Sequence, residues 1–374
     1  MENNNDNKVL NVPHLRFPEF SGEWETKSIN DLADVIGGGT PDTTVKSYWD
    51  GGIQWFTPSE IGKNKFVDAS LRTITEDGLN NSSAKLLPPN TILLSSRATI
   101  GECSLSLREC ATNQGFQSLV SKKCNVDFLY YLIQTKKKDL IRKSCGSTFL
   151  EISANEVRKI QVSVPSDVEQ QKIAGLLSLI DKRIATQNKI IEKLQSLIKG
   201  LAVALTTKEK ANIAISQCLE CHSSTLQESE VLSSGLCKVF GANGLVGYKD
   251  VPQMNGDAIL VIKDGSGVGT VSYAQGKFSV IGTLNYLTVI GNNDLRYLYF
   301  ALSVFNFQPY KTGMAIPHIY FKDYGKAKIY CPSLAEQKRV ANVLDKLESK
   351  LFVEQELLAS FNQQKLYLLG KMFI

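Results

Sequence analysis

One segment, Cys218-Leu-Glu-Cys221-His222, matches the C-x-x-C-H pattern that attaches c-type haem. That attachment requires export, and the N-terminal residues MENNNDNKVL lack the basic and then apolar layout of a secretory signal. The chain has three histidines, and the other two are His14 and His318. We therefore expect buried thiols at this segment, and the sequence gives little support to histidine catalysis.

The glycine and proline motifs of nucleotide and methyl-transfer chemistry are incomplete. An amino-methyltransferase holds its target amine with an Asn/Asp-Pro-Pro-aromatic loop, but Pro88-Pro89 lies between Leu87 and Asn90. The run Gly37-Gly38-Gly39 is followed by Thr40-Pro41 and not by the long helix that a phosphate or cofactor site requires, so we interpret it as a hinge or a DNA-facing turn. The sequence contains no G-x-x-x-x-G-K-[ST] loop.

A nuclease metal site has equally weak support. Pro41-Asp42 could supply the first part of a carboxylate metal site, and Glu348 with Lys350 could supply the second. Glu348 and Lys350 lie in a predicted long helix, where they repeat Asp181 and Arg183 of the first half. We therefore regard their combination with Pro41-Asp42 as coincidental. The sequence therefore predicts no catalytic centre and no metal site.

The composition predicts an ordinary folded protein. The 374 residues are 43% hydrophobic and 21% charged, which suffices for two domains with cores of their own. No apolar run reaches the ~20 residues of a membrane span, and the eight scattered cysteines suit free thiols in a reducing compartment. We expect a cytoplasmic protein without membrane contact, and the net charge of +5 permits a polyanionic partner.

The chain is duplicated, and the duplication organises every other feature. A shift of 167 residues lays 165–184 on 332–351 without a gap, with identity at Pro165/Pro332, Ser166/Ser333, Glu169/Glu336, Gln170/Gln337, Ala174/Ala341 and Leu177/Leu344. The same shift places Asp127 on Asp294 and the strand-like segment at Ile92 on that at Ile259. Near the start of each half the best shift is 186, so the first half carries nineteen more residues.

That second shift bears on the C-x-x-C-H pattern. It lays Cys218 and Cys221 on Leu32 and Val35, which are apolar positions of a predicted opening helix. The cysteines therefore occupy core positions.

Each half ends in a predicted long helix whose apolar residues recur with alternating steps of four and three, as in a coiled coil. The two series include Ile173, Leu177, Ile180, Ile184 and Ile191, and Val340, Leu344, Leu347, Leu351 and Leu358. Gln187 and Glu354 interrupt them at equivalent positions, which indicates either register control or an exposed end of the seam. About 33 residues at ~1.5 Å each give a rod near ~50 Å.

These patterns predict an α+β protein of two duplicated domains, each followed by a long helix. If an approximate two-fold relates the halves, the helices form an antiparallel coiled coil with the domains at opposite ends. We expect an N-terminal tail at 1–21, domains at 22–164 and 208–331, and helices at 165–207 and 332–374. A plain dimerisation zipper is the alternative, and the duplication disfavours it.

From Phe17 onward the sequence resembles the specificity (S) subunit of type I restriction-modification enzymes. The resemblance rests on PSDVEQQKIAGLLSLID and its repeat PSLAEQKRVANVLDKLE, with LLSSRATIG at Leu93, ATNQGFQSL at Ala111 and GANGLVGY at Gly241. It implies that each domain is a target-recognition domain for one half of a split double-stranded DNA site. It also implies that the helices set the spacer and dock methyltransferase (M) subunits, two in number.

The resemblance places the chemistry on other chains. The M subunits and the restriction (R) translocase-nuclease subunits would hold S-adenosylmethionine, ATP and magnesium, and this chain would bind no cofactor. A coiled-coil scaffold with protein-binding end domains is the alternative function, and a self-sufficient restriction enzyme is disfavoured by the missing motifs.

Two domains that recognise different half-sites should differ where they contact bases. The largest divergence lies between 37–86 and 223–253, which makes these segments the first choice for base contact. The predicted DNA-binding residues there are Thr40, Lys46, Tyr48, Gln54, Thr57, Ser59, Lys63 and Lys65, with Lys238 and Asn243 in the second half. For Trp49 and Trp55 we expect core packing of at least one.

Further contacts are predicted in the strand-rich parts of both halves. Arg97 suits guanine, whereas the second half has Asp264 at that position, and the neighbouring Lys263 and Ser266 are its predicted contacts. Asn113 and Gln114 suit adenine, and Asn285 is their rough counterpart in the second half. A basic run is predicted to contact phosphates, with a solvated helix face as the alternative: Lys136, Lys137, Lys138, Arg142 and Lys143, and Lys311 in the second half.

Overall fold

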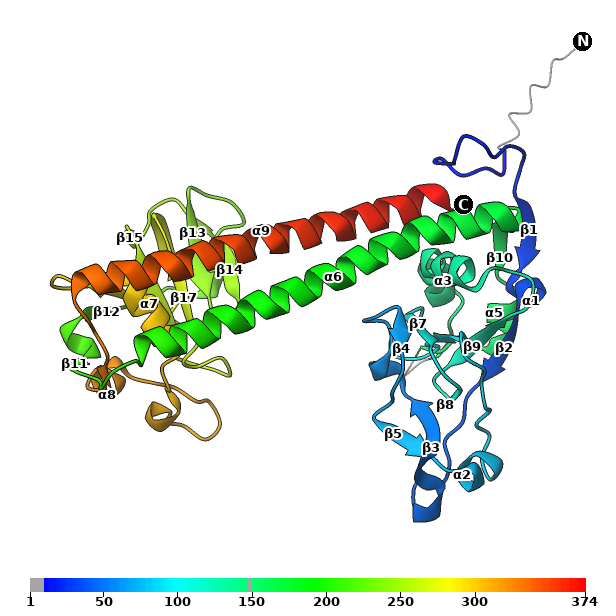
Figure 1. Cartoon of the computed structure of the whole chain (residues 1–374), viewed down its shortest axis with the longest axis horizontal. Helices are drawn as coiled ribbons and strands as arrows, with labels where there is room; N and C mark the ends of the chain where they lie inside the picture. The colour runs from blue at the N-terminus through cyan, green and yellow to red at the C-terminus, as the bar shows by residue number, and fades with distance from the viewer. Residues whose placement is uncertain (1–9, 147–149) are drawn as a thin grey trace, which may run out of the picture. The chain divides into compact units, whose positions relative to one another are not determined.

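The computed structural model describes residues 10–146 and 150–374 (Figure 1). Contacts divide the chain into two compact units, one formed by 1–187 with 358–374 and the other by 188–357. Residues 1–9 of the predicted N-terminal tail, and residues 147–149 of the turn after the basic run, lie outside the described residues. The predicted domain boundaries stay predictions, because each unit also takes in parts of the two long helices.

The first unit holds two β-sheets and short helices. The larger sheet has the order β2-β9-β6-β7-β4, formed by Ala33–Gly37, Gln117–Ser121, Ile92–Leu94, Cys103–Ser106 and Phe66–Val67. The smaller has the order β5-β3-β8, formed by Arg72–Ile74, Trp49–Phe56 and Cys110–Thr112, with β3 and β8 parallel. A two-stranded ribbon joins β1 (Glu25–Ser28) to β10 (Gln161–Val164). The helices are α1 (Ile29–Leu32), α2 (Glu76–Asn80), α3 (Val126–Thr135), α4 (Lys137–Arg142) and α5 (Ala154–Arg158).

The second unit repeats this plan. One sheet has the order β12-β19-β16-β17, formed by Leu219–Ser223, Leu284–Val289, Ala258–Ile262 and Val271–Ala274. The other has the order β14-β13-β18-β15, formed by Gly244–Lys249, Cys237–Gly241, Lys277–Val280 and Met254–Asn255, with β13 and β18 parallel. The remaining elements are β11 (Ile213–Ala214) paired with β20 (Lys328–Ile329), α7 (Leu295–Ser303) and α8 (Phe321–Tyr324). Both units therefore share one α+β fold, which confirms the predicted duplication.

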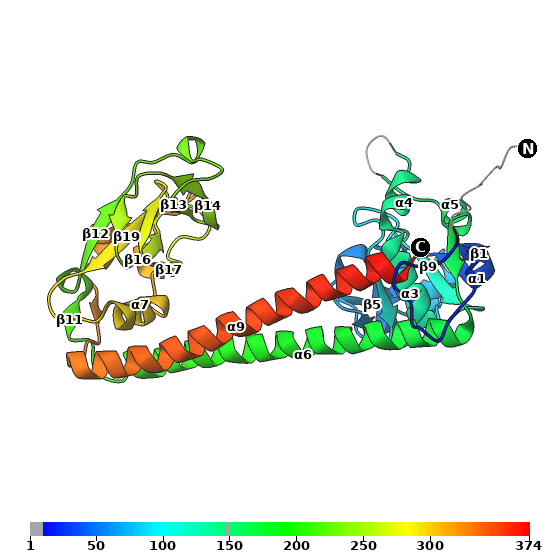
Figure 2. The same cartoon turned by 90° about the horizontal axis from the view of Figure 1, so that it is seen from above.

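The two long helices are α6 (Asp167–Thr206) and α9 (Leu334–Met372). In the first unit the start of α6 and the end of α9 share one core, through residues that include Ile173, Leu177 and Met372. In the second unit the end of α6 and the start of α9 do the same, through Ala202 and Leu344. The helices therefore run antiparallel within each unit, as predicted (Figure 2). At 40 and 39 residues they fill almost all of the predicted ranges 165–207 and 332–374, and each is about 60 Å long.

The predicted coiled-coil positions face inward. Six are buried: Ile173, Leu177, Ile180, Ile191, Val340 and Leu344. Four are half-buried: Ile184, Leu347, Leu351 and Leu358. The polar interruptions Gln187 and Glu354 are 5% and 7% exposed, so the explanation by an exposed end of the seam was wrong and register control remains.

The predicted opening helix of each half is shorter than its apolar spacing indicates. The opening helix α1 ends at Leu32, and Val35 lies on β2 because residues 33–37 pair with β9. In the second half a 3₁₀ turn at Ile215–Gln217 leads directly into β12, which carries Cys221. In both places the ladder of backbone hydrogen bonds overrides a helical spacing of apolar residues.

The glycine run after β2 is not a hinge. A Cβ atom on Gly38 would lie 2.0 Å from the carbonyl oxygen of Asn113, and one on Gly39 would lie 2.2 Å from Oγ of Ser83. The Gly39 amide also donates to the carbonyl of Thr112 at 2.8 Å. The glycines allow two segments of backbone to pack closely, which fixes this connection in place.

The cysteines form no disulfide and differ in burial. All eight cysteines are free; Cys218 is buried and Cys221 is half-buried. Within the described parts of the chain, no three His, Cys, Asp or Glu side chains gather where they could hold a metal ion. Nor does any described helix combine the length and apolar character needed to cross a membrane.

Candidate nucleic-acid interface

A buried glutamine joins each domain to its long helix. Gln170 accepts a hydrogen bond from the Asn125 amide at 2.9 Å and donates to the Pro165 carbonyl at 3.0 Å. Gln337 accepts from the Asp294 amide at 2.8 Å and donates to the Pro332 carbonyl at 2.8 Å. Asn125 and Asp294 are the N-caps of α3 and α7.

These bonds explain the glutamine of the repeated Pro-Ser-x-x-Glu-Gln motif, because it ties the start of the long helix to the domain helix beside it. They also correct the alignment locally. The residue equivalent to Asp294 is Asn125, and the gapless shift had placed Asp127 there.

A second junction in the first unit contains Lys65. Its ammonium group lies 2.6 Å from Asp127 and donates to Tyr131 at 3.1 Å and to Ser178 at 2.7 Å. Tyr131 in turn donates to Asp181 at 2.5 Å. The Lys65 side chain is 8% exposed, so its prediction as a DNA contact was wrong. The lysine is used to fasten α3 to α6.

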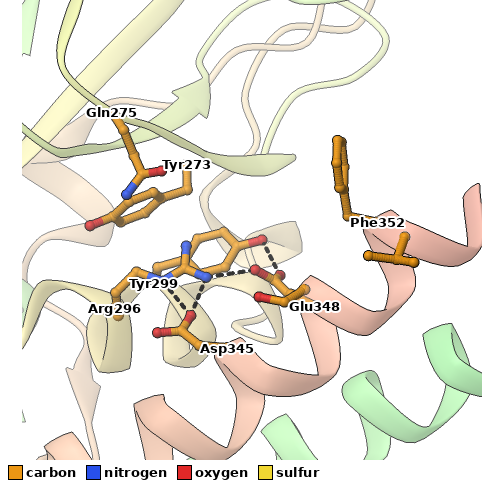
Figure 3. Close-up of a pocket in the computed structure, with 9 residues that line it drawn as sticks. Tyr273, Gln275, Arg296, Tyr299, Asp345, Glu348 and Phe352 are labelled. Atoms are coloured by element: carbon orange, nitrogen blue, oxygen red, sulfur yellow. Dashed lines mark hydrogen bonds and ion pairs between the residues drawn. The ribbon is translucent and has the colours of Figure 1, made fainter. Parts of the chain in front are cut away.

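The second unit builds the same junction from an arginine on α7 (Figure 3). Arg296 donates to Asp345 at 2.6 Å and to Glu348 at 2.7 Å, and Tyr299 donates to Glu348 at 2.8 Å. Its guanidinium carbon lies 4.3 Å from the ring centre of Tyr273. Burial opposes the charge, but the two carboxylate hydrogen bonds outweigh it and raise the pKa of Arg296.

This junction lines an open pocket of about 690 Å³ that extends to Phe352 and Val353 on α9. Glu348, which had resembled half of a nuclease motif, is a structural carboxylate here. Asp181 has the equivalent role in the first unit.

In the first unit, hydrogen bonds bring five predicted contact residues close together. We call them the polar cluster: Thr40, Thr57, Ser59, Asn113 and Gln114. The Thr40 hydroxyl bonds to the Gln114 side-chain oxygen at 2.5 Å, and the Thr57 and Ser59 hydroxyls lie 3.1 Å apart. The Asn113 amide donates to the carbonyl of Phe56, the residue before Thr57. Thr40, Ser59 and Gln114 are exposed.

The other predicted residues of segment 37–86 have either exposed side chains or side chains that already contact the protein. Lys46 and Lys63 are exposed, whereas Tyr48 packs partly against the core around Trp49 and Trp55. Both tryptophans are buried, which confirms core packing. The side-chain oxygen of Gln54 accepts from the Ser70 amide at 2.7 Å and from the Ser70 hydroxyl at 3.0 Å.

Arg97 lies in the first unit at a position where the two domains have opposite charges. It forms an ion pair with Glu151 at 2.8 Å, and one antiparallel backbone bridge links the same two residues. The second unit has the equivalent bridge between Asp264 and His318. The Arg97 side chain is still 44% exposed, so it can contact DNA only if it shares or leaves Glu151.

Most of the basic run is already engaged. Lys136 donates to the Ile374 carbonyl at 2.7 Å, and burial lowers its pKa. Lys137 pairs with Glu102, and Lys143 lies 3.6 Å from Glu156. Lys138 is exposed. The run is therefore a weaker phosphate-binding surface than its sequence predicts.

In the second unit, Lys238 on β13 and Asn243 in the turn before β14 are exposed, and so is Ser266. Lys311 is half-buried. Asn285 is 4% exposed and its oxygen accepts from Ser223 at 2.9 Å, so it is not the freely exposed amide that was predicted.

Asn285 instead lines a pocket of about 430 Å³ at one edge of the sheet, together with the predicted Lys263. Tyr320 and Lys322 line the same pocket and were missed from the sequence. Their signal was a pair of aromatic residues followed by a basic one in Tyr320-Phe321-Lys322, which lies outside the divergent segments.

The fold and these surfaces define a duplicated binding protein whose two α+β domains present different polar loops on one scaffold. A family model for the type I restriction modification DNA specificity domain matches residues 21–196 and 222–363. The chain therefore belongs to the family of type I restriction-modification specificity proteins.

Individual relatives agree. The specificity subunit of type I restriction enzyme MjaIX from Methanocaldococcus jannaschii is 39% identical over 180 residues, which are 46% of this chain and 42% of that protein. The EcoprrI specificity subunit of Escherichia coli is 24% identical over 360 residues, 87% of this chain and 88% of that one. The chain thus spans less than half of the first relative's length but most of the second's.

A solved structure shows the same fold. The S subunit of a type I restriction-modification system from M. genitalium superposes with a TM-score of 0.65 at 19% identity, covering 97% of this chain and 99% of that one. A chain from a type I restriction-modification complex gives a TM-score of 0.57 at 15% identity.

Proposed function

We propose that this chain recognises a bipartite DNA site for a type I restriction-modification complex, with one domain for each half of the site. The observation that carries the proposal is a repeated scaffold with unlike loops. The sheets, the glutamine anchors and the helix junctions recur in both units. The polar side chains near the ends of β2 and β12 differ, since Thr40 bonds to Gln114 in the first unit and Ser223 bonds to Asn285 in the second. Such a protein can carry two recognition domains of the same fold and still bind two different DNA sequences.

The partners of the proposed function are duplex DNA, two methyltransferase subunits and the restriction translocase-nuclease subunits. We propose that those subunits carry S-adenosylmethionine, ATP and magnesium, and that this chain supplies no catalytic group. The helices α6 and α9 would set the spacer and dock the methyltransferase subunits. We expect the complex in the cytoplasm, where the DNA is.

Methylation sequencing of cells with and without this chain tests the proposal. We expect adenine methylation at one split site only when the chain is present. Replacing 22–164 with the corresponding segment of another family member should change one half of that site and leave the other half intact. A change in both halves would contradict the assignment of one domain to one half.

The same purified complex distinguishes the alternative function. If the chain is a coiled-coil scaffold with protein-binding ends, the complex should be indifferent to duplex DNA even at low salt. A linear fall of log affinity with log salt concentration, in contrast, would show neutralised phosphates.

A further inference from the structure

The loop at 312–318 in the second unit has an apolar tip in open solvent. Met314 is 106% exposed and Ile316 is 67% exposed, and Ala315 between them is also exposed. Isolated apolar side chains are ordinary on a protein surface, but a run of three at the tip of one loop costs solubility and indicates a surface that becomes covered.

This loop is built rigidly. Thr312 and His318 exchange two backbone hydrogen bonds of 2.9 and 2.8 Å across its base. Gly313 has φ +88°, and a Cβ atom there would lie 2.3 Å from the Ile316 carbonyl oxygen. The tight turn therefore requires glycine, and it holds the apolar tip outward before any partner binds.

The base of the loop is fastened to the residues directly after β16, an inner strand of its sheet. The Gly265 amide donates to the Pro317 carbonyl at 2.9 Å, and the Ile319 amide donates to the Lys263 carbonyl at 2.9 Å. These bonds place the loop beside the pocket of about 430 Å³ that contains Lys263 and Lys322.

Lysines lie near the base of the apolar tip, and Lys263 and Lys322 share their pocket with Asp264. Lys311 directly precedes the loop, and the Lys322 ammonium lies 5.2 Å from the centre of the Tyr320 ring. This combination matches the chemistry of duplex DNA, in which stacked bases lie between two rows of phosphates. Proteins that kink DNA insert Met, Ile, Leu, Phe or Pro between base steps and hold the flanking phosphates with cations.

We propose that the loop 312–318 is a wedge that inserts Met314 and Ile316 against the base stack of the second half-site, while Lys311, Lys263 and Lys322 hold the neighbouring phosphates. This inference rests on the proposed function. It goes further, because it adds recognition through the deformability of base steps to recognition through hydrogen bonds.

The test uses the full chain assembled with its methyltransferase partner and a duplex that carries the site found by methylation sequencing. A series of duplexes places 2-aminopurine at single positions across the second half-site, avoiding the methylated adenine. Insertion of the wedge should raise the fluorescence at one base step. The double variant Met314→Ser/Ile316→Ser should abolish that rise and weaken binding ~10- to 100-fold, as expected for two buried apolar side chains.

Matched variants separate the wedge from the cations. Met314→Leu/Ile316→Leu should retain binding and fluorescence, since it keeps the apolar tip. Val289→Ser, at the far end of β19, is the control for loss of an exposed apolar side chain and should change neither. Lys322→Gln should reduce the slope of log affinity against log salt by about 0.9, whereas the serine double variant should leave that slope unchanged.

Three results would overturn the inference. Equal affinity and equal fluorescence for the wild-type and serine variants would show that the tip does not enter the stack. If the serine double variant no longer assembles with the methyltransferase subunits in the absence of DNA, the tip contacts protein and not DNA. Failure of the wild-type complex to bind any duplex would refute the proposed function itself, and the wild-type arm distinguishes that failure from the other two.

Discussion

Replacing Gln337 by methionine should loosen the joint between the second domain and α9. The glutamine is 2% exposed, and its amide satisfies the Asp294 amide and the Pro332 carbonyl, both at 2.8 Å. Methionine has nearly the same length and shape but no strong donor or acceptor, so it leaves both partly buried backbone groups unpaired. Each such group costs ~1–3 kcal/mol, and for the pair we expect ~3 kcal/mol.

Hydrogen exchange of the first turn of α7 measures this cost where it arises. A local destabilisation of ~3 kcal/mol predicts exchange that is ~100-fold faster at the amides that open with the joint. Gln355→Met is the control, since Gln355 lies on an exposed face of the same helix. If Gln337→Met and Gln355→Met give the same exchange in α7, the glutamine is not an anchor and our explanation of the repeated motif fails.

Three further predictions concern charges and thiols. Lys65→Met should lower the melting temperature of the complex, because Asp127 loses its cation. The same variant should leave the slope of log DNA affinity against log salt unchanged. A changed slope would show that Lys65 contacts a phosphate after all. Arg296→Met should destabilise the second unit by ~2–4 kcal/mol in urea unfolding, because two partly buried carboxylates lose their partner, whereas Arg296→Lys should recover only part of the loss. Burial raises the pKa of Cys103 to about 12 from 9.0, so a thiol reagent at pH 8 should label the exposed Cys145 well before it. Because the folded-state pKa is the higher one, the contribution of Cys103 to stability is complete below pH 9.0 and is lost as the pH rises to about 12; Cys103→Ala should flatten that alkaline decline in urea midpoints.

The duplication and the long helices were predictable because both leave signals that need no tertiary context. The gapless repeat from Pro165 and the apolar spacing through Leu177 were sufficient for the fold class and for the antiparallel pair of helices. The opening helices were not predictable in this way. Their apolar spacing continues into residues such as Val35 whose backbone pairs with a strand more than 80 positions later in the chain.

The candidate contact residues were predictable only as a region. Sequence divergence brought attention to the segment that holds Thr40 and Thr57, and the structure brings these residues together with Gln114. Sequence divergence did not indicate which side chains are already hydrogen-bonded within the protein. Gln54 and Asn285 have the right chemistry for bases, but Ser70 and Ser223 occupy their oxygens.

Lys65 shows why divergence between repeats is an ambiguous signal. Both units need a cation between the domain helix and the long helix, where a tyrosine hydroxyl and a carboxylate meet. In the second unit Arg296 supplies it from α7 itself, whereas in the first unit Asp127 lies on α3 and Lys65 arrives from the longer segment before β4. The longer segment of the first half, residues 37–86, therefore includes a structural part of the junction. A position at which the repeats differ can thus perform one shared task with two different side chains, and only the contacts of each side chain separate that case from a difference in the DNA sequence recognised.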